Sequence, residues 1–223
     1  MTPEFPETLD KPVAGRLFAP VIGSAFRCIV ADPPWPYEGR GPASSKEHRP
    51  NSYGAAPSSV ERYGAMSIAE LCELTPKAED DAHCYIWTTN SFVCEAHQIA
   101  EAWGFSPKTL LTWGKMKPDG TPSMKTGYYF RGATEHCLFS VRGSLRLNGP
   151  CKPTLYLSER LPHSRKPEWF YRLCEEVSPG PYLELFARRK RHGWASWGNE
   201  LANDVEMPND QAEARQPATS ANQ

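Results

Sequence analysis

In the segment FRCIVADPPW, residues 26–35, a short apolar run is followed directly by an aspartate and two prolines. An apolar run of this length, bounded by turn residues, is typical of a strand that is buried on both faces. Pro33 and Pro34 lack the N–H group that a strand ladder requires, so the strand has to end close to Asp32. The segment therefore predicts a buried strand over residues 26–31 whose carboxyl end carries an aspartate followed by a stiff loop.

Helix and strand patterns alternate through the rest of the chain. This alternation predicts an α/β fold with a mostly parallel sheet and helices on both faces. Ser67-Ile68-Ala69-Glu70 has the capping-box pattern that starts a helix. In chain order we expect helices over 67–74, 92–103 and 170–177, and strands over 83–89, 109–113, 136–141 and 182–186.

Length and composition fit one folded domain, since the chain has 223 residues, of which 39% are hydrophobic and 23% charged. We expect an N-terminal extension over 1–25, the domain over 26–202 and a disordered tail over 203–223, which lacks aromatic residues. With no long apolar stretch we expect no membrane contact and a cytoplasmic location, and we make no prediction of oligomeric state. The net charge of −1 argues against a uniformly basic surface but allows a local basic patch. Seven scattered cysteines without a C-x-x-C pair predict reduced thiols and no metal centre.

The tetrapeptide Asp32-Pro33-Pro34-Trp35 has the composition of a ligand site, and it stands where open α/β sheets bind their ligands. The Asp32 carboxylate and the proline carbonyls are acceptors, which suits the exocyclic amino group of an adenine. Trp35 and Tyr37 supply aromatic faces that could stack on the base. The alternative is an ordinary turn with Trp35 in the core. No metal ion or covalent intermediate is required.

A second candidate surface lies between residues 114 and 133, where cationic and aromatic side chains interleave. Such interleaving is typical of a surface that follows a nucleic-acid strand, because cations contact phosphates and aromatic rings stack on bases. The alternative is a solvated loop with ordinary surface lysines. The candidate substrate-binding residues here are Lys115, Lys117, Lys125, Tyr128 and Arg131, with Tyr129 beside them.

Five groups of residues, in order along residues 26–201, resemble the MT-A70 family of adenine N6-methyltransferases. They are Asp32-Pro33-Pro34-Trp35, Tyr63-Gly64-Ala65-Met66-Ser67, Glu135-His136-Cys137-Leu138, Ser164-Arg165-Lys166-Pro167, and Glu184-Leu185-Phe186-Ala187-Arg188 with Trp194 and Gly198-Asn199-Glu200-Leu201. The order and number of these matches make the resemblance far more specific than any single motif.

The resemblance implies a Rossmann-like methyltransferase fold with a circularly permuted motif order and S-adenosylmethionine as cofactor. It implies that Asp32, Pro33, Pro34 and Trp35 form the catalytic element, with Asp32 also near the cofactor, and that Tyr63 borders the target base. It further implies that the cofactor's ribose and adenine are lined by Glu184, Phe186, Arg188, Asn199 and Glu200.

Three positions depart from the family pattern. Thr134 stands where nucleic-acid-methylating members carry a lysine that suits the cofactor carboxylate, and we carry the position over as cofactor-binding. Lys190-Arg191 replaces the common ribose-contacting pair His-Asn, and Asn199-Glu200 replaces Asn-Gln. These departures concern single cofactor contacts and leave the class of enzyme unchanged.

From these features we expect S-adenosylmethionine-dependent methyl transfer to N6 of adenine in DNA, with RNA as the alternative substrate. The target adenine must leave its stack, so we expect a flipped or single-stranded base. Asp32 acts either as a base or only as a hydrogen-bond acceptor. The other classes we consider are an inactive nucleic-acid-binding relative and a small-molecule methyltransferase with the same cofactor site.

Overall fold

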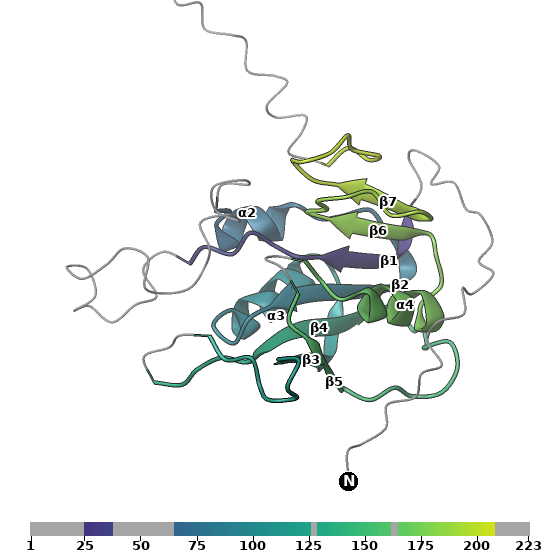
Figure 1. Ribbon diagram of the computed structural model, residues 1–223. Helices are drawn as coiled ribbons and strands as arrows, with labels where there is room; N and C mark the ends of the chain where they lie inside the picture. The colour runs from purple at the N-terminus through teal and green to yellow at the C-terminus, as the bar shows by residue number, and fades with distance from the viewer. Residues whose placement is uncertain (1–24, 38–64, 126–128, 162–164, 208–223) are drawn as a thin grey trace, which may run out of the picture.

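The computed structural model describes residues 25–37, 65–125, 129–161 and 165–207. In these residues a seven-stranded sheet has the order β5-β3-β4-β2-β1-β6-β7 (Figure 1). The strands are β1 Phe26–Ala31, β2 Ala78–Thr88, β3 Ser106–Met116, β4 Thr134–Arg142, β5 Leu155–Glu159, β6 Tyr182–Leu185 and β7 Trp194–Trp197. The helices are α2 Ile68–Glu73, α3 Val93–Ala102 and α4 Glu168–Val177. No helix within the described ranges is long and apolar enough to cross a membrane.

The strand directions confirm the expected α/β fold. β1 is parallel to β2 and to β6, β6 is parallel to β7, and β3 is parallel to β5. β4 is antiparallel to both of its neighbours, β2 and β3. Because β4 alone runs against the strands beside it in the described sheet, the sheet is mostly parallel, as a Rossmann-like fold requires.

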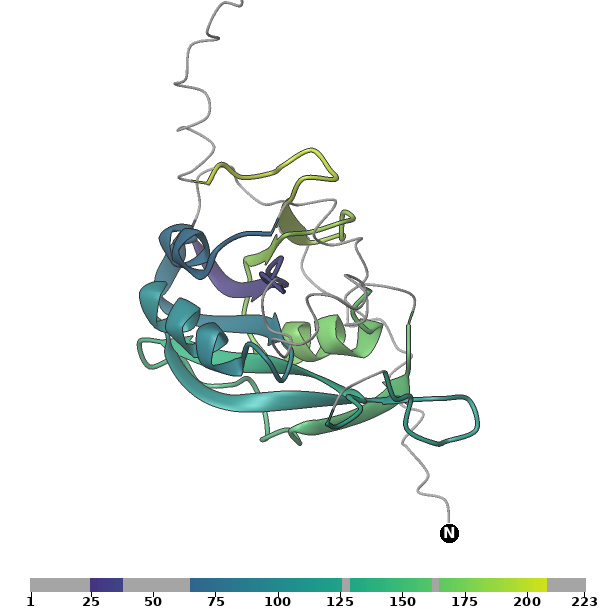
Figure 2. The ribbon, with the colours of Figure 1, turned by 90° about the vertical axis from the view of Figure 1, so that its left-hand side faces the viewer.

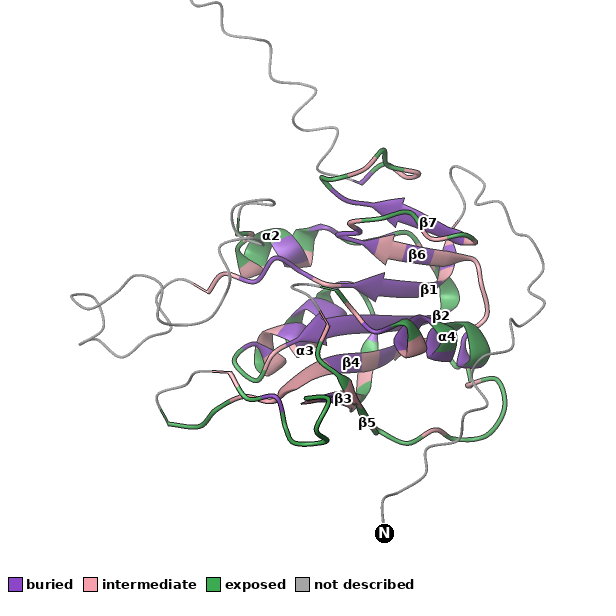
Figure 3. Ribbon diagram, viewed as in Figure 1, coloured by how far each residue is buried: buried purple, intermediate pink, exposed green. Residues whose placement is uncertain are grey.

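Helices cover both faces of the sheet, and the side chains of β1 show it directly. Ile29 and Ala31 belong to the apolar cluster under α2 and α3, whereas Cys28 and Val30 belong to the cluster under α4. Figure 2 shows α2 and α3 lying apart from α4, and Figure 3 shows β1 buried along its length. Burial on both faces explains why this strand is an unbroken apolar run in the sequence.

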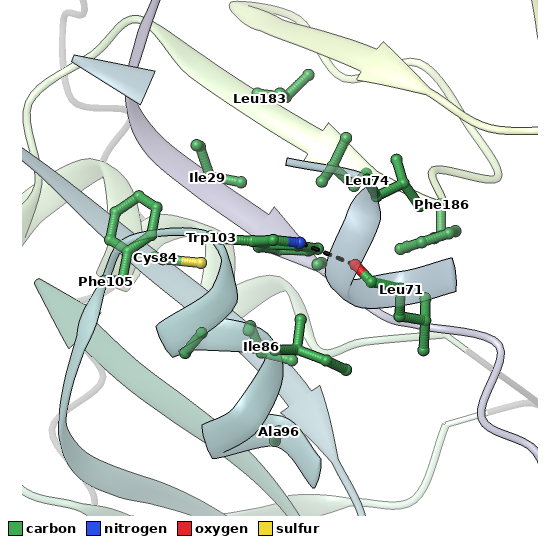
Figure 4. Packing of buried hydrophobic residues seen from close by; sticks show 14 of the residues in the cluster. Ile29, Leu71, Leu74, Cys84, Ile86, Ala96, Trp103, Phe105, Leu183 and Phe186 are labelled. Carbon is green, nitrogen blue, oxygen red and sulfur yellow. Dashed lines mark hydrogen bonds between the residues drawn. The ribbon is translucent and has the colours of Figure 1, made fainter. Parts of the chain in front are cut away.

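Two local contacts fix α2 and α3, the helices that pack on one face of the sheet. The capping box at α2 is confirmed, since the Glu70 N–H donates to Ser67 Oγ at 3.2 Å and the Ser67 N–H donates to Glu70 Oε2 at 2.7 Å. The Trp103 indole, at the end of α3, donates to the Leu71 carbonyl at 2.8 Å (Figure 4). This bond satisfies a buried indole N–H and ties α3 to α2 within the core.

Some boundaries differ from the sequence prediction. β2 begins at Ala78 instead of residue 83, and the sequence analysis missed β5 and β7. The tail was predicted to begin at residue 203, but residues 203–207 are part of the fold. Asn203 Oδ1 accepts the Gly198 N–H at 2.8 Å, Asp204 exchanges two bonds with the Ser196 backbone, and Met207 is buried. Polar residues bind the backbone at the end of β7 here, so the polar composition of residues 203–207 did not mean disorder.

The topology places a switch point at the carboxyl end of β1. From β1 the chain passes to β2 on one side, and it returns through β6 to the other side. Such a reversal is where open α/β sheets bind ligands. The residues that follow β1, β2 and β6 all reach this edge, together with the start of the antiparallel strand β4.

Candidate active site

Asp32 follows β1 directly and lies at this edge of the sheet. The Lys166 ammonium donates to Asp32 Oδ2 at 2.7 Å, across 134 positions of sequence. Lys166 precedes Pro167, the N-cap residue of α4. The start of α4 therefore holds a cation over the end of β1, where the sequence predicts the functional aspartate.

Glu135 is the second carboxylate of the site. It is the second residue of β4, whose start lies at the same edge because this strand runs opposite to β2. Glu135 Oε2 lies 3.5 Å from the Lys166 ammonium, and Glu135 Oε1 accepts a short hydrogen bond from Lys115. The Lys125 ammonium lies 3.9 Å from Glu135 Oε1. We call Asp32, Lys115, Lys125, Glu135 and Lys166 the acid–lysine cluster.

The oppositely charged groups of this cluster stabilise one another's ionised forms. Burial raises the pKa of Glu135, but the ammonium groups of Lys166 and Lys115 outweigh burial and lower it to about 2. Burial likewise opposes the charge of Lys166, but Asp32 and Glu135 outweigh it and raise the lysine pKa above its ordinary value. Both groups are therefore ionised at neutral pH, so Lys166 is not a candidate base. The cluster provides fixed charges in a partly buried setting, where they act strongly.

Two indole rings lie under the lysines. The Lys166 ammonium lies 5.1 Å from the Trp87 ring centroid and the Lys115 ammonium lies 4.6 Å from that of Trp113. The two rings contact each other edge to face at 6.3 Å, and both are buried. Cation–π attraction of this kind stabilises ammonium groups that have lost part of their water.

Glu184 adds a carboxylate on the neighbouring strand. β6 pairs in parallel with β1, so that Glu184 lies opposite Val30, whose side chain faces α4. The Tyr171 hydroxyl on α4 donates to Glu184 Oε1 at 2.6 Å. Burial raises the pKa of Glu184, and the negative charge of Asp32 adds to this rise, as expected for carboxylates that lie at the same edge of the sheet.

Each proline carbonyl of the tetrapeptide already accepts one backbone hydrogen bond, and its use as an acceptor for the substrate stays a prediction. The Pro33 carbonyl accepts the Trp35 N–H at 2.9 Å, and the Pro34 carbonyl accepts the Met66 N–H at 3.2 Å. The reason is that a loop leaving a buried strand must pair its backbone groups, and prolines offer acceptors alone. The prolines therefore fix the loop and tie it to the start of α2, and Asp32 is left as the polar side chain that the tetrapeptide offers.

Trp35 also differs from the expectation that it stacks on a base. Its side chain is 3% exposed and stacks on Phe92, with ring centroids 5.1 Å apart and planes 19° apart. Its indole N–H donates to the Trp87 carbonyl at 3.1 Å. Both ring and N–H are thus used within the core, as in the alternative interpretation of the motif. Tyr37 lies half-buried beside Phe92, and burial raises its pKa, as do the charges of Asp32 and Glu135.

We expect Trp35→Phe to lower the free energy of unfolding by about 1 to 3 kcal/mol, because it removes the bond to Trp87 and leaves a small cavity. Chemical denaturation measures this loss. Trp103→Phe is the matched control, since Trp103 is also a buried indole that donates to a backbone carbonyl, away from the site. A Trp35→Phe variant of unchanged stability that binds oligonucleotides at least tenfold more weakly would restore the base-stacking assignment.

The predicted strand-binding residues separate into buried and exposed groups. Lys115 is 6% exposed and pairs with Glu135, so its assignment to a nucleic-acid surface is wrong. Lys117 and Arg131 are exposed, and Lys125 is half-buried. Tyr63 and Tyr128 lie outside the described residues. Two aromatic side chains of the same segment, Tyr129 and Phe130, are 88% and 92% exposed.

The predicted cofactor residues lie at the ends of β4, β6 and β7, which share the site edge. Thr134 faces away from the acid–lysine cluster and interacts with Asn90 and His136 on the α3 side. Phe186 has a φ of 59° and a ring packed against Trp197 in the core. The backbone of Phe186, and not its side chain, therefore lies at the site edge of the sheet. Arg188 is half-buried, and Asn199 and Glu200 are exposed in the turn after β7.

Sequence reasoning missed Lys166 and Glu135 as site residues, although both lie within motifs that matched the family. Both residues were treated only as members of a motif, and no ion-pair partner was assigned to either of them. The signal that could have found them is position, since Glu135 begins a strand and Lys166 precedes a helix start at the predicted ligand edge. Their mutual contact cannot be read from spacing, because it joins distant segments.

The sheet order, with its switch point at β1, defines a Rossmann-like fold of the methyltransferase type. The sequence profile described as MT-A70 matches residues 26–200. The match covers most of the chain, and the chain therefore belongs to the MT-A70 family.

Curated relatives agree with this assignment. A Medicago truncatula protein named putative N(6)-adenosine-methyltransferase MT-A70-like is 28% identical over 84% of this chain and 28% of its own length. The type II methyltransferase M.MunI of Mycoplasma sp. is 28% identical over 86% of this chain and 85% of its own length. The N6-methyladenosine RNA methyltransferase MTA1 of Cryphonectria parasitica is 30% identical over 79% of this chain and 52% of its own length. The chain thus spans little more than a quarter of the plant relative and most of the length of M.MunI.

Proposed function

We propose that this protein transfers a methyl group from S-adenosylmethionine to N6 of adenine in DNA. The observation that carries the proposal is the Asp32 carboxylate, held by Lys166 at the end of the central strand β1. This is a fixed, charged acceptor at the ligand edge of the sheet, and an exocyclic amino group is a donor that suits it. Membership of the MT-A70 family supports the class of reaction.

The residues at the site edge of the sheet fit the proposed cofactor by their chemistry. The Lys166 ammonium suits the cofactor's carboxylate, and the Glu184 carboxylate on the neighbouring strand suits ribose hydroxyls. Both side chains lie on the α4 side of β1 and β6. When bound, S-adenosylmethionine supplies an electrophilic methyl group on a sulfonium centre.

The protein's part in the reaction is alignment. The adenine amino nitrogen is a poor nucleophile, because its lone pair is delocalised into the ring. Asp32 accepts hydrogen bonds from this amino group, orients it, and disperses the positive charge that grows on the nitrogen. Lys166 and Glu135 remain charged throughout; Lys166 holds Asp32 in place, and Glu135 pairs with Lys166.

DNA is the favoured substrate because this chain covers 85% of the length of M.MunI, which is named as a type II methyltransferase. RNA is the second candidate, since a relative 30% identical is named as an RNA methyltransferase. The flipped or single-stranded target base and the cytoplasmic location stay predictions. The test is to incubate the protein with methyl-labelled cofactor and matched single-stranded DNA, duplex DNA or RNA, and then digest to nucleosides. We expect label in N6-methyldeoxyadenosine, and label in any other nucleoside, or none, would contradict the proposal.

The exposed residues Tyr129, Phe130 and Arg131 are proposed to bind the substrate strand. Phe130 is 92% exposed next to Arg131, whose Nε donates to the Lys125 carbonyl at 3.2 Å. Because a stacked base contributes about 1 to 3 kcal/mol, we expect Phe130→Ala to weaken oligonucleotide binding by about 5-fold to 150-fold. Fluorescence anisotropy measures this affinity.

Phe130→Trp is the matched control, since it keeps an aromatic face at the same position and should retain the affinity within about threefold. Equal affinities of Phe130→Ala and the unmodified protein would exclude Phe130 from the substrate-binding surface. They would leave the assignment of Asp32 untouched, because Phe130 is 92% exposed and is not a member of the acid–lysine cluster.

A further inference from the structure

Two basic residues stand where the family resemblance places a ribose-contacting pair, and the structure engages both of them within the protein. Lys190 pairs with Asp204 at 2.5 Å. Arg191 forms a two-armed contact with Glu168, the first residue of α4, with distances of 2.5 Å and 2.9 Å. These contacts give Arg191 a fixed geometry that an isolated surface arginine does not have.

Arg191 lies flat against Tyr171, the residue that binds Glu184. The centre of its guanidinium is 3.7 Å from the Tyr171 ring centroid. Trp194 contacts the same ring edge to face at 5.7 Å, and the ring is 4% exposed. The Tyr171 hydroxyl then donates to Glu184 Oε1 at 2.6 Å. A continuous chain of contacts therefore runs from Glu168 to Glu184.

We propose that Arg191 is a positioning residue for the cofactor: clamped by Glu168, it holds the Tyr171 ring so that the Tyr171 hydroxyl fixes the orientation of the Glu184 carboxylate toward the cofactor's ribose. In this chain the arginine therefore acts on the ribose indirectly, through Tyr171 and Glu184. The family resemblance implies a residue in direct contact with the ribose at this position. The inference rests on the proposed function, because it takes Glu184 as a cofactor residue.

The charges around Glu184 agree with this role. Burial raises the pKa of Glu184 and Asp32 on β1 raises it further, whereas the Tyr171 hydroxyl on α4 and the guanidinium groups of Arg191 and Arg189 lower it. Loss of Arg191 removes one of the influences that keep the carboxylate ionised. The protonated form then persists to higher pH, and it accepts hydrogen bonds from hydroxyl groups less well.

The test measures the affinity of the full chain for S-adenosylhomocysteine by calorimetry as a function of pH. We expect Arg191→Met to weaken binding by about tenfold at neutral pH, with a further loss as the pH falls that begins at higher pH than in the unmodified protein. Arg191→Lys keeps the charge but not the planar fork, and should recover part of the affinity. Turnover at saturating cofactor should stay within about twofold, because the effect is on binding.

Arg189→Met is the control for the loss of charge, since Arg189 contacts the same Glu168 carboxylate at 3.5 Å and its charge also lowers the pKa of Glu184, but it takes no part in the contacts through the Tyr171 ring. Tyr171→Phe provides a second variant, which keeps the ring packing and removes the hydroxyl, and the same loss of affinity is expected. If Arg191→Met and Tyr171→Phe bind as the Arg189→Met control does, the positioning role is overturned while the proposed function stands. If the unmodified protein does not bind S-adenosylhomocysteine, both fall.

Discussion

Asp32→Ala is expected to lower the rate of adenine methylation by at least about a thousandfold, because it removes the acceptor that orients the amino group and stabilises its growing charge. The fold should persist. Lys166 still has Glu135 as a partner at 3.5 Å, and the strand that precedes Asp32 is buried on both faces. Methyl transfer from labelled cofactor to a single-stranded DNA oligonucleotide measures the effect, and circular dichroism checks the fold.

The control for this variant is Asp81→Asn. Asp81 is an exposed carboxylate near the start of β2, at the edge of the sheet opposite to the site, where it accepts a hydrogen bond from the Ser144 N–H at 2.7 Å, and it takes no part in the acid–lysine cluster. We expect this variant to retain activity within about twofold. A folded Asp32→Ala protein that methylates at more than a tenth of the unmodified rate would show that Asp32 is not the orienting group.

Lys166→Met is expected to have the largest effect on stability, with a loss of about 3 to 5 kcal/mol, because it leaves two partly buried carboxylates without their shared cation. The change also alters the response to acid. Since the pKa of Glu135 is lowered to about 2 in the folded protein, its contribution is fully present above the ordinary pKa near 4.5 and is lost as the pH falls toward 2. Without Lys166 the folded pKa moves back toward its ordinary value, so this acid-dependent part of the stability shrinks.

Denaturant titrations between pH 3 and pH 7 measure both effects. Lys152→Met is the matched control, because Lys152 forms an ion pair with Glu176 that is exposed to solvent, and such pairs contribute about 0 to 1 kcal/mol. If Lys166→Met and Lys152→Met lose the same small amount, then Lys166 does not hold the cluster together.

The sequence predicted the central strand and its aspartate well, because the signals are local. Residues 26–31 form an unbroken apolar run, and prolines that follow cannot continue a ladder. The capping box at Ser67 is local in the same way. β5 was missed because it is short and lies at the sheet edge, where Leu155 and Leu157 point outward and give no burial signal. Its position depends on pairing with β3, which no window of sequence contains.

The site was predicted in its position but not in its contacts. Asp32 was identified from the motif, whereas its partner Lys166 arrives from the start of a helix 134 residues away. Lys115 was assigned to a nucleic-acid surface because lysines are usually exposed, but the ion pair with Glu135 allows it to be buried. Trp35 was assigned to base stacking because aromatic residues next to a ligand motif can serve either role. In the structure the Trp35 ring is buried against Phe92, which shows that it belongs to the core.

The central claim, that Asp32 receives the amino group of the target adenine, is tested most directly by a crystal structure of the protein bound to S-adenosylhomocysteine and a short adenine-containing DNA strand. We expect the exocyclic amino group to lie within hydrogen-bonding distance of the Asp32 carboxylate, with the homocysteine carboxylate beside Lys166 and the ribose beside Glu184. An adenine bound elsewhere, or an Asp32 carboxylate that faces away from the base, would contradict this assignment of Asp32.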